Sequence, residues 1–192
     1  NGDALAQSFI DQRQAALSIT PDSLGFDAGP AQRVYGLLVE TGYDDAIVTL
    51  VTLADGTTSL HLCNGGGFTG LGHYAAIRKS TEALLALAQD LLPQAEKVAS
   101  FPLPERGRTR FYFLTSDGVF SAEFSQDDLV NGRLPLSPLF LQAREVIARL
   151  SIWDKRSQAM LEYSSRGDVR NILKMLEMDP LLAEARDDTG LT

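Results

Sequence analysis

Residues 57–92 read TTSLHLC, NGGGFTGLG and HYAAIRKSTEALLALAQDLL in succession, and they decide the fold of this chain. The first part alternates polar and apolar side chains, as a β-strand does. The second part contains five glycines, which permit positive φ angles and close backbone contacts. The third part places Ile77, Leu84, Leu87 or Ala88, and Leu91 on one helical face. The stretch therefore predicts a strand, a glycine-rich turn and an amphipathic helix that packs on a sheet.

The chain on either side of this stretch predicts further strands and helices. Asp55-Gly56 and Asp117-Gly118 are typical of tight hairpin turns between antiparallel strands. Helices are expected over 3–17, with Asp3 as the N-cap, and from Ser137 to Leu150. Residues 1–152 are therefore expected to form an α+β domain with a largely antiparallel, five-stranded sheet covered by helices. Its strands are predicted near 34–39, 46–53, 58–63, 108–114 and 119–124, and residues 94–107 are expected to be a loop or an edge strand.

The composition narrows the classes of protein to which the chain can belong. It has 192 residues, one cysteine and a formal net charge of −8. An acidic surface repels nucleic acids and anionic membranes, so we expect neither as a partner. One cysteine rules out an internal disulfide framework and is typical of a reducing compartment. No apolar run is as long as a membrane span. We therefore expect a cytoplasmic protein.

The C-terminal residues 153–192 are expected to form a separate helix pair. From Ser157 the sequence reads SQAMLEYSSRGDVRNILKMLEMDPLLAEARDDTGLT, which predicts a short helix up to Gly167 and a second one that ends before Asp179-Pro180. A polar turn follows at 187–190. This pattern resembles about one ankyrin repeat. The matching residues are Gly167, Ile172, Leu173, Leu176, Ala185, Arg186, Asp187, Gly190 and Thr192.

The ankyrin resemblance implies binding to a protein partner. A single repeat cannot bury its apolar face, and about three are needed for a stable stack. Either the natural protein continues past Thr192 with further repeats, or the helix pair packs on the preceding domain. The number of repeats required favours the first alternative. Ser164 and Ser165 replace the alanines usual in the first helix, which suits a terminal repeat.

The order of helices and strands in residues 3–152 is similar to that of the roadblock or profilin-like arrangement. This resemblance lies in the element order alone. It implies a homodimer formed through a shared sheet or helix pair, and regulation of a partner such as a small GTPase.

The glycine-rich turn is the candidate ligand site. Gly65-x-Gly67-x-x-Gly70 matches the pattern of a dinucleotide-binding loop, and backbone N–H groups at a helix start favour phosphate. The candidate ligand-binding residues are Gly65, Gly66, Gly67, Gly70, Gly72 and His73. However, the preceding strand alternates like a half-exposed antiparallel strand, whereas a dinucleotide site follows a buried parallel one. We therefore prefer a glycine turn that lets the strand and helix pack tightly; an anion or protein backbone at the Tyr74 end of the helix is an intermediate alternative.

Two further groups of residues are candidate sites. His61, Cys63 and His73 cluster around the same turn, but no paired ligand motif supports a metal. We interpret them as a buried thiol and two hydrogen-bonded histidines. Arg106, Arg108 and Arg110 are expected to share one strand face. They indicate either a charged edge or recognition of an acidic partner.

These patterns together predict a non-enzymatic protein-interaction or regulatory module, with no catalytic residue, metal or cofactor. One alternative is a small-ligand or nucleotide-binding domain that uses the loop 65–72. Another is an immunity-type protein that neutralises a basic toxin, to which an acidic surface is suited.

Overall fold

A computed structural model describes residues 5–27, 32–69 and 74–178, with the side chains of residues 76 and 153 left aside. Within it the chain forms two compact units, 1–147 and 148–192. The first unit is an α+β domain built on an antiparallel sheet, as the sequence predicts. Among the described residues, no helix combines the length and the apolar character needed to cross a membrane.

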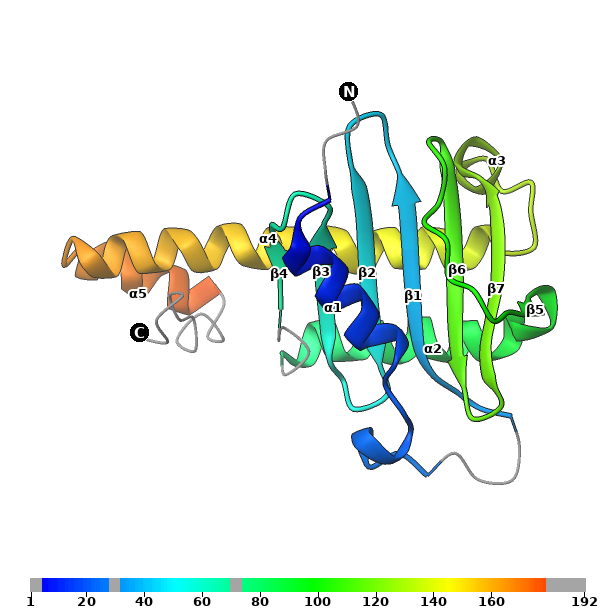
Figure 1. The fold of residues 1–192 in the computed structure, drawn as a ribbon. Coiled ribbons are helices and arrows are strands. Elements are labelled where there is room, and N and C mark those ends of the chain that lie inside the picture. The colour runs from blue at the N-terminus through cyan, green and yellow to red at the C-terminus, as the bar shows by residue number, and fades with distance from the viewer. Residues whose placement is uncertain (1–4, 28–31, 70–73, 179–192) are drawn as a thin grey trace. The chain divides into compact units, whose positions relative to one another are not determined.

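The sheet has seven strands in the order β4-β3-β2-β1-β6-β7-β5. Every neighbouring pair is antiparallel (Figure 1). The bounds are β1 Val34–Gly42, β2 Ile47–Leu53, β3 Thr58–Leu62, β4 Gly67–Phe68, β5 Glu96–Lys97, β6 Arg108–Thr115 and β7 Gly118–Ser125.

The expectation of five strands is wrong, because two short strands extend the sheet at its edges. The five predicted strands are all present, but β4 and β5 add two residues each. The strand β4 arises within the glycine-rich stretch, where Gly67 pairs with His61 and Phe68 with Leu60. The strand β5 lies in the segment 94–107, for which an edge strand was one of the two alternatives, whereas β4 was not expected. Strands of two residues are too short to show an alternating pattern.

Strand β1 lies at the centre of the sheet, and all nine of its residues are buried. The pairing of β1 with β6 has a bulge between Val34 and Gly36. At Gly36 a Cβ would lie 2.8 Å from side-chain carbons of Leu114 and Leu53 on the two neighbouring strands. This glycine therefore leaves room for the apolar side chains that meet over the middle of the sheet.

Helices cover both faces of the sheet (Figure 1). Helix α1, Gln7–Leu17, lies on one face, and α2, Ala75–Leu91, lies on the other together with the first turns of α4, Ser137–Ser165. Helix α3, Gln126–Val130, is a single short turn after β7. Among the described residues, Asp22–Leu24 and Leu92–Gln94 form 3₁₀ helices.

Helix α1 begins later than the sequence predicts. Its N-cap is Ala6, which offers no capping side chain, while Asp3, the expected cap, lies outside the described residues. Instead of a side-chain cap, the Ala6 N–H donates to the carbonyl oxygen of Cys63 at 2.9 Å. The start of α1 is thus fixed by the loop that follows β3.

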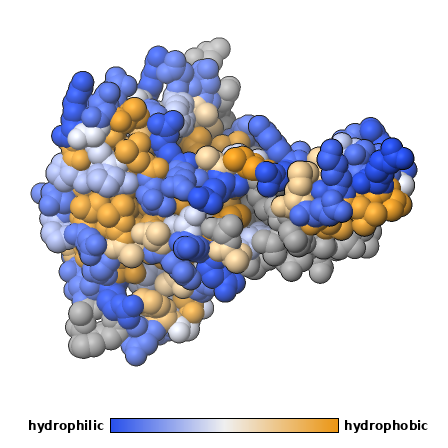
Figure 2. Space-filling model, turned by 180° about the vertical axis from the view of Figure 1, so that it is seen from behind, coloured by the Kyte–Doolittle hydropathy of each residue, from blue (hydrophilic) through white to orange (hydrophobic). Residues whose placement is uncertain are grey.

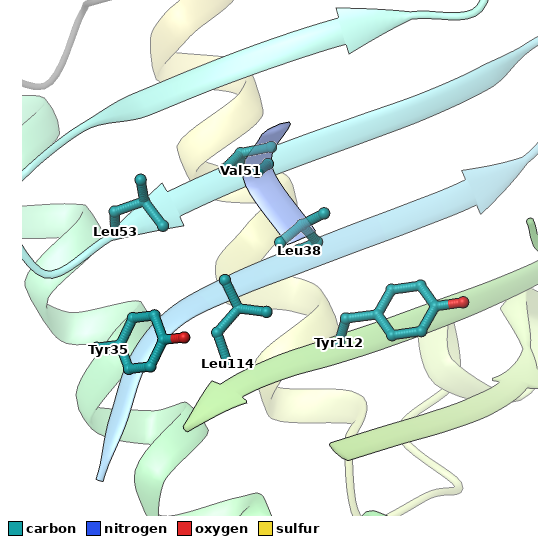
Figure 3. Close-up of a cluster of buried hydrophobic side chains, with 7 residues drawn as sticks. Tyr35, Leu38, Val51, Leu53, Tyr112 and Leu114 are labelled. Atoms are coloured by element: carbon teal, nitrogen blue, oxygen red, sulfur yellow. The ribbon is translucent and has the colours of Figure 1, made fainter. Parts of the chain in front are cut away.

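An apolar cluster holds α1 against its face of the sheet (Figure 3). Side chains from β1, β2 and β6 point toward one another there, and Ala16 of α1 packs against them. The hydroxyl of Tyr35 donates to the carbonyl oxygen of Ile19 at 2.9 Å, which satisfies the polar end of this ring. The buried members are Ala16, Tyr35, Leu38, Val51, Leu53, Tyr112 and Leu114.

Helix α2 packs on the opposite face, as its apolar stripe predicts. Ile77, Leu84 and Ala88 are buried. The hydroxyls of Thr58 on β3 and Thr81 on α2 are 2.8 Å apart and buried, so each satisfies the other. Near the end of the helix, the Gln89 side chain accepts the backbone N–H of Val34 at 2.8 Å.

The two helices predicted from Ser137 to Leu150 and near Ser157 are in fact one continuous helix, α4. Neither Gly nor Pro occurs between Leu150 and Ser157, so nothing breaks the backbone hydrogen bonding. The helix ends before Gly167, whose φ of 66° is left-handed. Helix α5, Val169–Met178, follows. The division between the two units falls within α4, between 147 and 148.

Candidate functional site

The three candidate partner-binding arginines each contact a carboxylate of the same chain. Arg106 precedes β6 and lies 2.5 Å from Asp44 in the turn between β1 and β2. Arg108 and Arg110 both pair with Glu123 on β7. The exposed fraction of the side chain falls from 73% at Arg106 to 40% at Arg108 and 22% at Arg110. Recognition of an acidic partner by these residues stays a prediction.

Arg110 belongs to a row of polar residues that crosses five neighbouring strands at one register. Arg110 on β6 pairs with Glu123 on β7 and with Glu40 on β1. Glu40 pairs with Thr49 on β2, and Thr49 pairs with His61 on β3. Directly paired residues point to the same face of a sheet. The row therefore places two carboxylates, a guanidinium, a hydroxyl and an imidazole on the face that α1 covers.

Arg13 of α1 adds a second guanidinium to this row. Its Nε donates to Oε1 of Glu40 at 2.7 Å, and its Nη2 donates to Oε2 at 2.8 Å. Thr49 Oγ1 also donates to Glu40 Oε1, at 3.1 Å. The Glu40 side chain is fully buried, and 13% of the Arg13 side chain is exposed. A carboxylate so enclosed needs a paired cation with good geometry, and Arg13 supplies it.

The same guanidinium also forms a hydrogen bond with the segment before β6. Arg13 Nη2 donates to the carbonyl oxygen of Phe101 at 2.9 Å, and the Tyr112 hydroxyl donates to that of Pro102 at 2.5 Å. The Arg13 guanidinium also lies 5.6 Å from the centre of the Tyr112 ring, within cation–π distance. Helix α1, the segment 101–102 and the sheet are thus joined around Arg13.

The pKa values in this cluster follow from burial and from the ion pair. Burial lowers the pKa of Arg13, but its hydrogen bond to Glu40 and the charge of Glu40 outweigh this, so the pKa lies above its usual value. Burial raises the pKa of Tyr112, and the Glu40 charge raises it further against the opposing effect of Arg110 and Arg13. Arg13 is therefore held in its protonated, charged form.

His61 and Cys63 lie on or next to β3, with their hydrogen bonds made inside the chain. His61 Nε2 is 2.9 Å from the Ser59 hydroxyl, and both residues are buried. Burial lowers the pKa of His61. The Cys63 thiol accepts the backbone N–H of Ile47 at 3.2 Å, and His73 lies outside the described residues. In the part of the chain that the structure describes, no three His, Cys, Asp or Glu side chains are arranged to hold a metal.

Strand β3 is antiparallel, as predicted, but it is not half-exposed. Thr58, Ser59, Leu60 and His61 are all buried. The alternation of polar and apolar residues suggested a solvent-facing side. In the structure the polar side chains Ser59 and His61 point to the same face of the sheet as Thr49. They are satisfied by the hydrogen bond between them.

The described glycines of the glycine-rich turn lie close to α1 and to residues 60–64. The N–H groups of Gly65 and Gly66 donate to the Leu62 carbonyl at 2.9 Å and to the Asn64 side chain at 3.0 Å. A Cβ on Gly65 would lie 2.8 Å from the Ser8 hydroxyl of α1. One on Gly67 would lie 2.0 Å from the Leu60 carbonyl oxygen. The described glycines therefore lie close to α1 and β3, and the preferred interpretation, tight packing of the strand on the helix that follows the turn, stays a prediction.

The remaining ligand-binding candidates of this turn, Gly70, Gly72 and His73, lie outside the described residues. The turn runs into strand β4, and α2 begins only at Ala75, with Tyr74 as its N-cap. Ligand binding at this turn stays a prediction.

The turn between α4 and α5 has well-formed capping contacts. The N–H groups of Gly167 and Asp168 donate to the carbonyls of Ser164 and Tyr163 at 3.0 and 2.9 Å, as expected at a helix end with a left-handed glycine. The Asp168 carboxylate then accepts the N–H of Asn171 at 3.2 Å and so caps α5. The two helices predicted around Gly167 are present, and residues 179–192 of the ankyrin-like turn lie outside the described part.

Helix α5 carries an apolar surface that the described contacts do not bury. Six of its ten residues are apolar, yet none is buried. The exposed fractions are 62% for Val169, 56% for Leu173 and 70% for Met178. Figure 2 shows hydrophobic side chains gathered along one side of the helix pair, opposite a hydrophilic side.

Comparison of the chain with protein-family models, curated protein sequences and solved structures gave no match. The ankyrin and roadblock resemblances thus rest on the residues and the element order alone.

Sequence reasoning missed Arg13–Glu40, a charged contact whose carboxylate is fully buried. One sign was available, since Glu40 interrupts the apolar run VYGLLVETG of a central strand. A carboxylate at such a position requires a partner. The sequence could not reveal that this partner lies on α1.

Proposed function

We propose that this chain is a non-enzymatic protein-interaction module whose helix pair binds a protein partner through α5. The observation that carries the proposal is the exposure of Val169 and Leu173 on a helix with six apolar residues in ten. An amphipathic helix gains stability by burying its apolar face, and contiguous exposed apolar surface marks an interaction site.

The capping contacts support this role. Gly167 and Asp168 fix where α4 ends and where α5 begins, so the apolar side chains of α5 are presented by a defined helix. A helix that is already formed pays less conformational entropy on binding than one that folds onto its partner. The ankyrin resemblance of this segment agrees with such a role.

The partner expected here offers an apolar surface of its own. Fully burying a side chain such as Val or Leu contributes about 1.5–3 kcal/mol. Two such contacts therefore account for about 100-fold or more in affinity. The acidic charge of the chain, −8 overall, favours partners whose surface around the apolar contact is basic.

The test is a pull-down from native cytosol with the chain as bait and mass spectrometry as readout. The double variant Val169→Glu/Leu173→Glu should lose the captured partner. The control is Lys174→Glu, because Lys174 is exposed in the same helix and its replacement changes the net charge by the same two units. Both variants are first compared with the wild type by circular dichroism.

The two variants separate loss of the apolar contact from a general effect of charge. A protein captured stoichiometrically by the wild type and the control, but not by the double variant, would support the proposal. Equal capture by all three baits, or by none of them, would contradict it.

A further inference from the structure

A groove runs along α1 in the first unit. It has a volume of about 530 Å³, within the range of about 300–1,000 Å³ typical of small-molecule sites. One wall is formed by residues of α1 at helical spacing and the other by residues just before β6. Its apolar lining consists of Leu5, Phe9, Ile10, Leu17, Phe101 and Leu103.

Arg13 gives the groove a cationic group among these apolar side chains. Its guanidinium has three nitrogens, and two of them are engaged. Nε and Nη2 donate to Glu40, and Nη2 also donates to the Phe101 carbonyl. The Nη1 group donates to no partner among the described residues, and it is not among their buried, unsatisfied side-chain atoms. Nη1 is therefore the accessible edge of this guanidinium.

The position of Glu40 makes Arg13 a prepared donor for a ligand. The carboxylate accepts hydrogen bonds from Nε and Nη2 of the guanidinium. It is fully buried and does not line the groove. The anchored side chain has already lost its rotamer freedom, so a ligand would not have to order it. The other polar side chains of the lining, Gln14 and Ser18, are uncharged. A hydrogen-bond acceptor that enters the groove therefore meets the Arg13 cation, and the lining contains no carboxylate.

We infer that this groove binds a small apolar carboxylate, with its hydrocarbon body against Ile10, Phe101 and Leu103 and its carboxylate on Nη1 of Arg13. A charged acceptor is preferred to a neutral one because hydrogen bonds between ionised groups are about twice as strong. This site lies in the first unit and does not depend on the function proposed for α5.

The experiment uses the full chain and two probes of equal chain length, decanoate and decanol, in isothermal titration calorimetry below their aggregation concentrations. Decanoate should bind with one-to-one stoichiometry and about tenfold more tightly than decanol. No binding of decanoate, or equal affinity for the two probes, would overturn the assignment of an anionic ligand.

Two substitutions at one exposed position locate the site. Ile10 is 38% exposed, so a polar side chain there is compatible with folding. Ile10→Glu should weaken decanoate binding about tenfold or more, because it removes an apolar contact and also repels the carboxylate; Ile10→Lys should weaken binding less, because it removes the contact without the repulsion. The control is Val130→Glu, at a residue of α3 that is 42% exposed and does not line the groove. Equal losses with Glu and Lys at position 10, or an equal loss in the control, would contradict the proposed site.

Discussion

Arg13 and Glu40 lie 27 positions apart in sequence and form a two-point ion pair between α1 and the central strand β1, with N–O distances of 2.7 and 2.8 Å. The Glu40 side chain has no exposed surface. Removing one member of a buried pair leaves the other charge uncompensated, whereas removing both does not. The stability of α1 on the sheet should therefore depend on the pair as a unit.

We expect Arg13→Met to lower the free energy of unfolding by about 3–5 kcal/mol. The double variant Arg13→Met/Glu40→Leu should lose less, because it no longer buries a charge. Urea denaturation followed by circular dichroism measures both. The control is Arg133→Met, which breaks the exposed pair with Asp128 and should cost less than about 1 kcal/mol. If the double variant were less stable than Arg13→Met, the uncompensated charge of Glu40 would not be the cause of the loss in stability.

The second prediction concerns acid stability. Burial lowers the pKa of His61 in the folded protein, so the unfolded chain binds the proton more readily. The stability that His61 contributes is present above the unfolded pKa of about 6.5 and is lost as pH falls through that value toward the folded pKa.

Replacing His61 should flatten this pH dependence. Urea midpoints of the wild type and His61→Gln at about pH 7.5 and about pH 5.5 provide the test. Glutamine cannot titrate and still reaches the Ser59 hydroxyl as a hydrogen-bond partner. The variant should lose less stability than the wild type between the two pH values. An equal loss in both proteins would assign the acid sensitivity to other groups.

The third prediction compares the effect of an alanine substitution at two neighbouring glycines, Gly66 and Gly67. A Cβ at Gly67 would lie 2.0 Å from the Leu60 carbonyl oxygen, and φ there is +145°. Gly67→Ala should therefore lower the free energy of unfolding by about 1–3 kcal/mol or more. Gly66→Ala is the matched control, since its Cβ would approach two side chains, those of Asn64 at 3.2 Å and Leu62 at 3.6 Å, and its φ is not in the left-handed region. Thermal unfolding compares them, and equal stabilities would contradict a packing role for Gly67.

The fourth prediction concerns the start of α5. The Asp168 carboxylate accepts the N–H of Asn171, and loss of such a cap costs about 1 kcal/mol. Asp168→Ala should raise the hydrogen-exchange rates of amides in α5, while Asp168→Asn, a good N-cap residue, should leave them nearly unchanged. Comparable exchange in the two variants would mean that the cap does not hold this helix.

The main elements of the fold could be predicted because each has a strong local pattern. The alternating segments 108–115 and 118–125 flank an Asp-Gly turn, and the apolar stripe of α2 repeats at helical spacing. Their order then indicates an antiparallel sheet with helices on it. The continuity of α4 was missed because an apolar stripe shows where a helix packs, whereas the absence of Gly and Pro shows where it can continue.

Much less of the candidate site could be predicted. The Arg13–Glu40 contact and the row that continues through Arg110, Thr49 and His61 depend on the register between strands and on the placement of α1. Neither is encoded in the spacing of residues along one segment. The arginines 106, 108 and 110 stand out in the sequence, but the carboxylates that pair with them, Asp44 and Glu123, are visible only in three dimensions.

The two outermost strands restrict how copies of this chain can assemble. Each presents only two residues, and Glu96 and Lys97 of β5 are exposed and charged. Such edges offer few free backbone groups to an incoming strand, which protects a sheet against edge-to-edge aggregation and amyloid-like growth. A homodimer that joined through β4 or β5 could therefore add only a short ladder of backbone hydrogen bonds. At high concentration, these two strands should be poor templates for the addition of further strands.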